Sequence, residues 1–133
     1  MSALSKLRPI GERAKIGVII PPSNTVNEAE FNRVAPAGVS FHFTRSPLHA
    51  DPAADDFREM LSDVKGAMAD LEACRVDYAT YACTAGSMAC PSSRLLGTMS
   101  ETSNIGSSST AQAIIAALSA LGVNKNFHGI ALY

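Results

Sequence analysis

A cysteine follows a hydrophobic run and precedes small, turn-forming residues in the stretch YACTAGSMACP, residues 81–91. Cys83 could be a small core residue, a metal ligand, half of a disulfide or a nucleophile, and each role needs different neighbours. Thr84 and Ala85 begin the run TAGS, which favours a sharp turn whose free N–H groups can bind a carboxylate and activate a thiol. From these residues alone, a catalytic and a structural role for Cys83 are about equally supported.

The other cysteines and the histidines limit the roles that are possible for Cys83. Cys83 and Cys90 lack the short spacing of a zinc knuckle, and no histidine pair joins them, so we expect no metal site. Cys74 ends a predicted helix, where a packing role is favoured. The three histidines are isolated from one another and are interpreted as structural: His42, His49 and His128.

Asn24 is the second candidate for chemistry. It lies in the loop PPSN, between a predicted strand and a predicted helix, where an asparagine commonly forms a non-catalytic Asx-turn. Its functional interpretation depends on Cys83, because an amide and a thiol at two strand ends can together hold and attack a small acid. Ligands of open parallel sheets bind outside the carboxyl ends of the strands, and both residues are predicted to lie there.

Alternating strands and helices must position these residues. We predict strands over 15–20, 39–45 and 76–82, the second of them at an edge because its two faces differ in polarity. A capping box of Thr25 and Glu28 predicts a helix over 26–34. Asp51 as cap and Pro52 as first helical residue predict a long helix, and its apolar stripe is Phe57, Met60, Leu61, Val64, Met68 and Leu71.

The remaining residues extend the pattern. We predict a short helix over 92–99 and a brief strand around Ile105. Ser109 and Gln112 form a second capping box, which opens a helix that Gly122 ends. The buried face predicted for this helix is Ala111, Ile114, Ile115, Leu118 and Leu121. A further strand is predicted over 129–133, and the fold class is α/β, an open parallel sheet with helices on both faces.

Composition limits the function classes. The chain has 133 residues, a net charge of -1 and 17% charged residues, which predicts one domain without a nucleic-acid footprint or a polybasic membrane patch. Its apolar stretches are far shorter than the roughly 20 residues of a membrane span. Residues 1–14 lack an apolar secretory leader, so we expect a cytoplasmic protein with reduced thiols and a small-molecule partner.

Three segments together carry a family resemblance. IGVIIPPSNTVNEAEF near the start, YACTAGS at the third strand and SSSTAQAIIAALSALGV before the fourth resemble the first half of the aspartate/glutamate racemase superfamily. Within it, the maleate cis-trans isomerases are the most similar branch, and the arylmalonate decarboxylases are close to them. The match extends over roughly residues 16–123 in order and spacing, which favours a functional Cys83.

The resemblance implies a cofactor-independent enzyme of two similar α/β domains, with a small dicarboxylic acid between them and one cysteine from each domain. Cys83 matches the first cysteine, whose thiolate adds to the double bond of maleate in the isomerases and removes an α-proton in the racemases. Asn24 matches an asparagine that binds a substrate carboxylate, and Thr84 and Ala85 match a turn whose backbone amides help. Arylmalonate decarboxylases lack a cysteine at this position.

This chain also departs from the family pattern, because members of the family are about twice as long. We therefore expect residues 1–14 to be a polar segment and residues 15–133 to be one racemase-like domain, truncated before a second domain and of low activity alone. A homo-oligomer is one expected assembly. The alternatives that remain are an amino acid racemase, an arylmalonate decarboxylase-like enzyme and a non-catalytic carboxylate-binding remnant. Tyr133 is predicted to lie inside a strand, so the role of a family tyrosine beyond that strand is not transferred to it.

Overall fold

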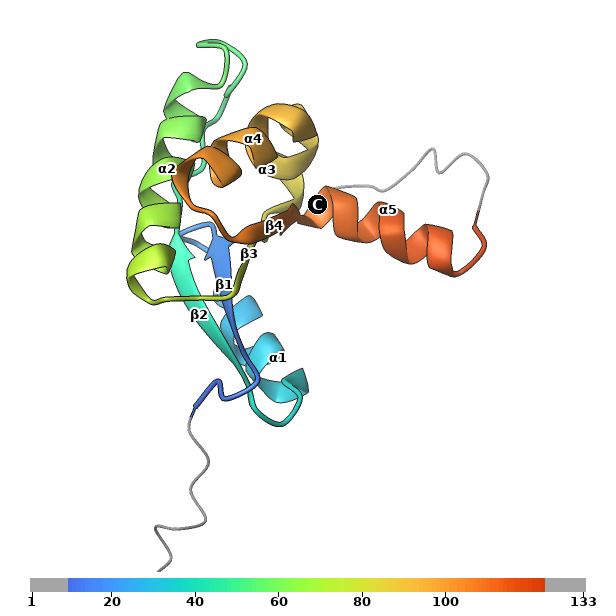
Figure 1. The fold of residues 1–133 in the computed structure, drawn as a ribbon. Coiled ribbons are helices and arrows are strands. Elements are labelled where there is room, and N and C mark those ends of the chain that lie inside the picture. The colour runs from blue at the N-terminus through green and yellow to red at the C-terminus, as the bar shows by residue number, and fades with distance from the viewer. Residues whose placement is uncertain (1–9, 124–133) are drawn as a thin grey trace, which may run out of the picture.

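The computed structural model of the chain describes residues 10–123. The elements are, in order, β1 (Ala14–Ile20), α1 (Asn27–Val34), β2 (Val39–Arg45), α2 (Arg58–Ala73), β3 (Tyr78–Tyr81), α3 (Thr84–Ala89), α4 (Ser92–Thr102), β4 (Gly106–Ser109) and α5 (Thr110–Ala120) (Figure 1). The alternation of strands and helices that the sequence predicts is therefore present.

Within the described residues, the strands form one four-stranded sheet in the order β2-β1-β3-β4. Every pairing is parallel, with Ile16 opposite Phe41 in β2 and opposite Tyr78 in β3. β2 lies at an edge, as its alternating pattern predicts. The predicted α/β class with an open parallel sheet is confirmed, although β3 is shorter than predicted, at 78–81.

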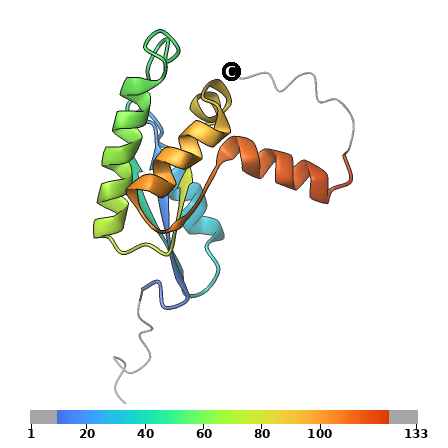
Figure 2. The same cartoon turned by 45° about the horizontal axis from the view of Figure 1, so that its top comes forward.

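Helices cover both faces of the sheet. On one face, α2 and α4 lie side by side and share a buried apolar cluster with the strands (Figure 2). The cluster includes Ile19, Val64, Met68, Leu71, Ala79, Tyr81, Leu95 and Met99. On the other face, the ring of Phe31 in α1 meets Phe41 and Phe43 of β2 edge-on, with centroids 5.0 and 6.0 Å away. Apolar burial on both faces stabilises the central strand β1.

Two predicted helix starts are wrong. Thr25 does not cap α1, because the side chain of Asn24 accepts the hydrogen bonds of the first free N–H groups instead. α2 begins at Arg58 rather than at Pro52, because Asp56 and Phe57 have positive φ angles of 57° and 64°, which a continuous helix does not allow.

α5 matches the prediction at its ends but not along its face. The capping box of Ser109 and Gln112 is present, and Gly122 ends the helix with a φ of 72°. None of the five predicted face residues is buried, because α5 projects away from the sheet and no other described element covers it (Figure 1). The predicted strand over 129–133 lies outside the described residues.

Candidate functional site

Cys83 is the N-cap of a short helix rather than part of an open turn. The sequence TAGS, predicted as a turn, forms the start of α3. The Sγ atom of Cys83 accepts a hydrogen bond from the N–H group of Gly86 at 3.4 Å, which is the position that a serine or aspartate oxygen takes in an ordinary cap. Cys83 is 7% exposed and belongs to the edge of the apolar core. The helix start fixes the direction of the thiol.

Asn24 holds the loop after β1. Its Oδ1 atom accepts hydrogen bonds from the backbone N–H groups of Val26 at 3.1 Å and Asn27 at 2.9 Å, which is the Asx-turn that the sequence allows. Its Nδ2 amide has no hydrogen-bond partner within residues 10–123. The turn therefore orients the side chain and leaves an N–H donor for a ligand.

Arg45, at the carboxyl end of β2, braces the same loop. Its guanidinium donates to the backbone oxygens of Pro21 at 3.4 Å and Asn24 at 3.3 Å, and it pairs with Glu28 at 3.2 Å. Arg45 was not among the predicted site residues, because no local pattern shows which backbone oxygens a long side chain reaches.

A pocket of about 340 Å³ brings the two candidates together. It lies at the carboxyl ends of β1, β3 and β4, where parallel sheets bind ligands. The pocket is lined by Pro21, Asn24, Asn27, Phe31, Ala82, Cys83, Thr84 and Thr110. Thr110 was missed because the strand before it was predicted around Ile105, whereas β4 is Gly106–Ser109 and ends directly before Thr110.

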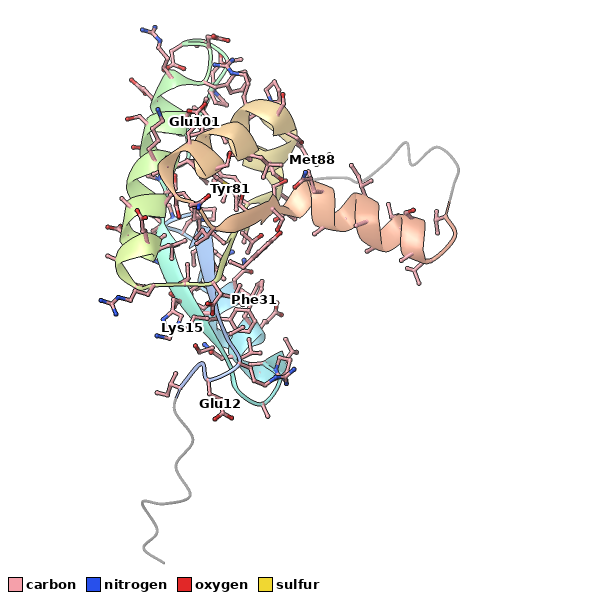
Figure 3. All side chains as sticks on the ribbon, in the orientation of Figure 1. Glu12, Lys15, Phe31, Tyr81, Met88 and Glu101 are labelled. Atoms are coloured by element: carbon pink, nitrogen blue, oxygen red, sulfur yellow. The ribbon has the colours of Figure 1, made fainter. Side chains whose placement is uncertain are left out.

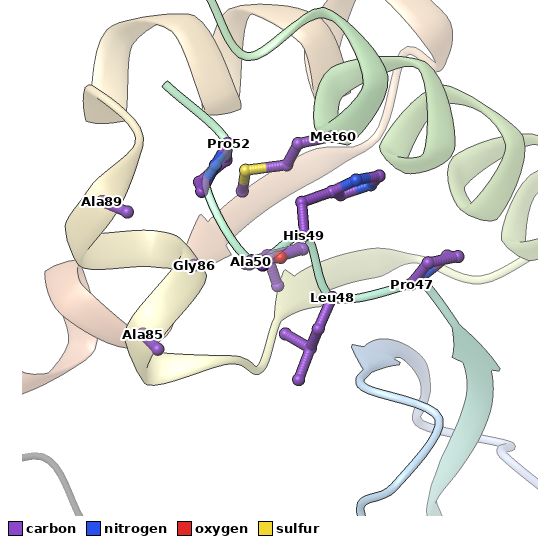
Figure 4. Close-up of a pocket in the computed structure, with 10 residues that line it drawn as sticks. Pro47, Leu48, His49, Ala50, Pro52, Met60, Ala85, Gly86 and Ala89 are labelled. Carbon is purple, nitrogen blue, oxygen red and sulfur yellow. The ribbon is translucent and has the colours of Figure 1, made fainter. Parts of the chain in front are cut away.

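Ala85 does not line this pocket. It borders a second pocket of about 190 Å³ on another side of α3, together with Gly86, Ala89 and residues of the segment 47–52 (Figure 4). His49 of that segment lies 2.7 Å from Asp63 and 3.4 Å from Glu59, through different ring nitrogens. These contacts fasten the segment to α2 and agree with a structural role for His49.

Buried polar groups hold α3 in place beneath the pocket. Ser87 is 2% exposed; its hydroxyl donates to the backbone oxygen of Thr84 and accepts from the N–H group of Ala111, which joins α3 to the start of α5. Tyr81 lies in the interior (Figure 3), and its pKa is raised above its usual value, first by burial and then by the nearby thiol of Cys83. The phenol therefore stays protonated next to the site.

The three thiols have different surroundings. Cys74 is exposed, whereas Cys83 and Cys90 are buried. Burial raises the pKa of Cys90, which favours its protonated form. Cys83 alone among them lines the pocket at the strand ends.

Two features are absent from the part of the chain that the structure describes. Between residues 10 and 123, no helix is long and apolar enough to cross a membrane. The same residues include no group of three or more histidine, cysteine, aspartate or glutamate side chains that could hold a metal ion.

Comparison with solved structures shows that the fold is that of the racemase-like α/β enzymes. A maleate cis-trans isomerase mutant from Nocardia farcinica, with a covalently bound succinylcysteine intermediate, is 24% identical, with a TM-score of 0.65 over 82% of this chain and 49% of that one. A maleate isomerase mutant from Pseudomonas putida S16 with maleate is 26% identical, with a TM-score of 0.62 over 82% and 49%. Arylmalonate decarboxylase is 20% identical, with a TM-score of 0.65 over 81% and 45%.

These matches confirm the resemblance inferred from the sequence at the level of the fold. The chain spans about half the length of the solved structures that it matches. No family model matches the sequence. No curated protein matches it either.

Proposed function

We propose that this chain is a maleate isomerase-like domain, which acts on a small dicarboxylic acid without a cofactor and uses Cys83 as nucleophile. The observation that carries the proposal is the shared pocket, in which a thiol, an asparagine amide donor and Thr84 meet at the strand ends. Two maleate isomerases share the fold, one with a covalently bound succinylcysteine intermediate and one with maleate. This supports a maleate-like diacid as the substrate class.

Each residue has a distinct role in this proposal. The Nδ2 amide of Asn24, which has no partner among residues 10–123, donates to one substrate carboxylate. Arg45 acts as a positioning residue by bracing the loop that carries Asn24. The backbone N–H groups of Thr84 and Ala85 belong to the first turn of α3 and bind charge there; the side chain of Ala85 does not take part. Such preorganised donors lower the free energy of a developing negative charge.

The proposed chemistry is reversible addition. The Cys83 thiolate adds to one alkene carbon of maleate, and the electron pair of the double bond moves to the neighbouring carbon and its carboxylate. The former double bond is now single and rotates. Expulsion of the thiolate then restores the double bond in the trans form, fumarate, with no net gain or loss of protons.

We further propose that residues 15–133 are one domain of a two-domain enzyme, with low activity when alone. The pocket is open, and the solved structures that share the fold are about twice as long. A second domain would exclude water and complete the positioning of the acid, and positioning contributes a large part of enzymatic rate. On this view, water protonates the adduct in the isolated chain, and S-succinylcysteine accumulates.

Peptide mass mapping after incubation with maleate tests the proposal. We expect a succinyl adduct on Cys83 whose rate of formation saturates with maleate concentration and which Cys83→Ser abolishes. Exposed Cys74 serves as the internal control, because its reaction should be slower and linear in maleate. Asn24→Ala should raise the half-saturating concentration by about tenfold, the loss expected for one charge-assisted hydrogen bond.

Two results would contradict the assignment. One is labelling of Cys83 that is linear in maleate and no faster than labelling of Cys74. The other is an unchanged half-saturating concentration in Asn24→Ala, which would remove Asn24 from the site. Loss of maleate and gain of fumarate, followed by NMR, measures the remaining turnover of the isolated chain.

A further inference from the structure

α5 is an uncharged helix whose apolar side chains are open to solvent. None of its residues is buried; Ile115 is 67% exposed, and Leu121 and Val123, just after the helix, are 78% and 44% exposed. Met88 of α3, 51% exposed, lies near the start of α5 at the surface (Figure 3) and enlarges the apolar area. A contiguous exposed patch of large apolar residues commonly marks an interface.

The described part of the molecule holds α5 mainly by its first turn. Ser109 and Gln112 form the capping box, the hydroxyl of Thr110 donates to the backbone oxygen of Tyr81, and the N–H group of Ala111 donates to Ser87. Beyond this turn the helix extends away from the sheet layers in both views (Figures 1 and 2). A helix of 11 residues is marginal in water without tertiary packing, so a covering surface would stabilise it.

The chemistry of α5 favours a second copy of the same chain as that surface. From residue 102 to residue 124 there is no Asp, Glu, Lys, Arg or His. Two identical faces without charge can pack on each other with neither like-charge repulsion nor a buried unpaired charge, which an isologous twofold contact requires. The alanines and Ser119 of α5 also allow two helices to approach closely.

The length of the solved structures points the same way. This chain matches about half of each, 49% of the Nocardia farcinica and Pseudomonas putida isomerases, so two copies have the size of one such chain. Thr110 at the start of α5 lines the Cys83 pocket. A surface that covers α5 therefore lies next to the wall of the pocket that Thr110 forms.

We infer that α5, with Met88, is the contact between two copies of this chain, and that this contact partly closes the Cys83 pocket. α5 has 11 residues, whereas a standard stable complex uses roughly 20–30 residues and 800 Å² per partner, so the dimer should dissociate on dilution. This inference concerns assembly and does not depend on the reaction of Cys83 with maleate.

Sedimentation of the full 133-residue chain over a range of concentrations tests it. We expect a monomer–dimer equilibrium whose dissociation constant rises at least about tenfold in Ile115→Lys and again in Leu121→Lys. Ile10→Lys is the matched control, because Ile10 is 83% exposed but lies before β1, at the opposite end of the sheet, and this variant should dimerise like the unaltered chain. Circular dichroism of each variant shows whether it is folded.

Iodoacetamide provides a second measurement, because it reports access to Cys83 without any substrate. Labelling of Cys83 should slow as the chain dimerises, and this concentration dependence should vanish in folded Ile115→Lys. If the chain is still a monomer at millimolar concentration, the inference is wrong. Protection of the α5 amides from exchange in that monomer would indicate that residues 124–133, and not a second copy, cover the helix. A dimer that survives both α5 substitutions, or that Ile10→Lys dissociates, would also overturn the inference.

Discussion

α2 and α5 have similar apolar patterns in sequence, but the structure buries the apolar side of α2 and leaves α5 without a buried residue. α2 buries Met60, Val64, Ala67, Met68 and Leu71 against the sheet and α4. α5 buries none of its residues, although it carries no charged side chain and α2 carries several. Periodicity therefore identifies the side of a helix suited to burial, while burial itself depends on a neighbouring surface.

The difference also separates stability from assembly. Side chains on α2 fill the core of one chain, so their loss leaves a cavity that the fold cannot refill. The side chains on α5 are half-buried or exposed in a single chain, so the loss of an exposed one changes the folded monomer little. Substitutions at matched positions on the two helices therefore distinguish core residues from interface residues.

The largest effect should come from Leu71→Ala compared with Ile115→Ala. Leu71 is 1% exposed and packs directly over Gly17 of β1. Its truncation should lower the free energy of unfolding by about 2–5 kcal/mol. Ile115→Ala should change it by no more than about 0.5 kcal/mol. Urea unfolding at low protein concentration, where the chain is monomeric, measures both values; equal losses would show that α5 packs in the monomer after all.

An intermediate effect on stability should come from Gly86→Ala in α3 compared with Gly97→Ala in α4. A Cβ atom at Gly86 would lie 2.5 Å from the hydroxyl oxygen of Tyr81, whereas one at Gly97 meets no atom within 4 Å. Gly86→Ala should therefore destabilise the fold by about 1–3 kcal/mol through overpacking. Gly97→Ala should stabilise it by about 0.5–1 kcal/mol through helix propensity.

Thermal unfolding of the two glycine variants checks this prediction, and alkylation of Cys83 adds a local measurement. Because the N–H group of Gly86 donates to Cys83, a displaced Gly86 should alter the alkylation rate of this thiol, while Gly97→Ala should leave it unchanged. A neutral or stabilising Gly86→Ala would mean that Tyr81 moves aside without cost.

The sequence was sufficient for β1, β2 and β3, because short runs of β-branched and aromatic residues are local signals. It placed the next strand around Ile105, whereas β4 is Gly106–Ser109 and contains only glycine and serine. It failed where geometry competes with local preference. Thr25 and Glu28 make a good capping box, but Asn24 accepts those hydrogen bonds first. Asp51 and Pro52 make a good helix start, but two residues of positive φ at 56 and 57 delay the helix to Arg58.

The position of the candidate site was predictable from the sequence, but the contacts around it were not. Asn24 and Cys83 follow buried strands, so the topology alone places them at one edge of the sheet, and the structure brings them to one pocket. The bracing role of Arg45 depends on where a long side chain reaches, and the separation of Ala85 from the pocket depends on α3 being a helix. Neither fact has a local sequence signal.

The smallest effect should come from the two predicted capping boxes, only one of which forms. Ser109 is fully buried and exchanges hydrogen bonds with Gln112, so Ser109→Ala should lower the free energy of unfolding by about 1 kcal/mol and loosen α5. Thr25 is exposed and does not cap α1, so Thr25→Ala should change it by no more than about 0.5 kcal/mol. Urea unfolding gives both values, and amide exchange along α5 should accelerate only in Ser109→Ala. Because α5 depends on its first turn for anchorage, a Ser109→Ala variant with unchanged exchange in α5 would show that a contact beyond the cap already holds the helix.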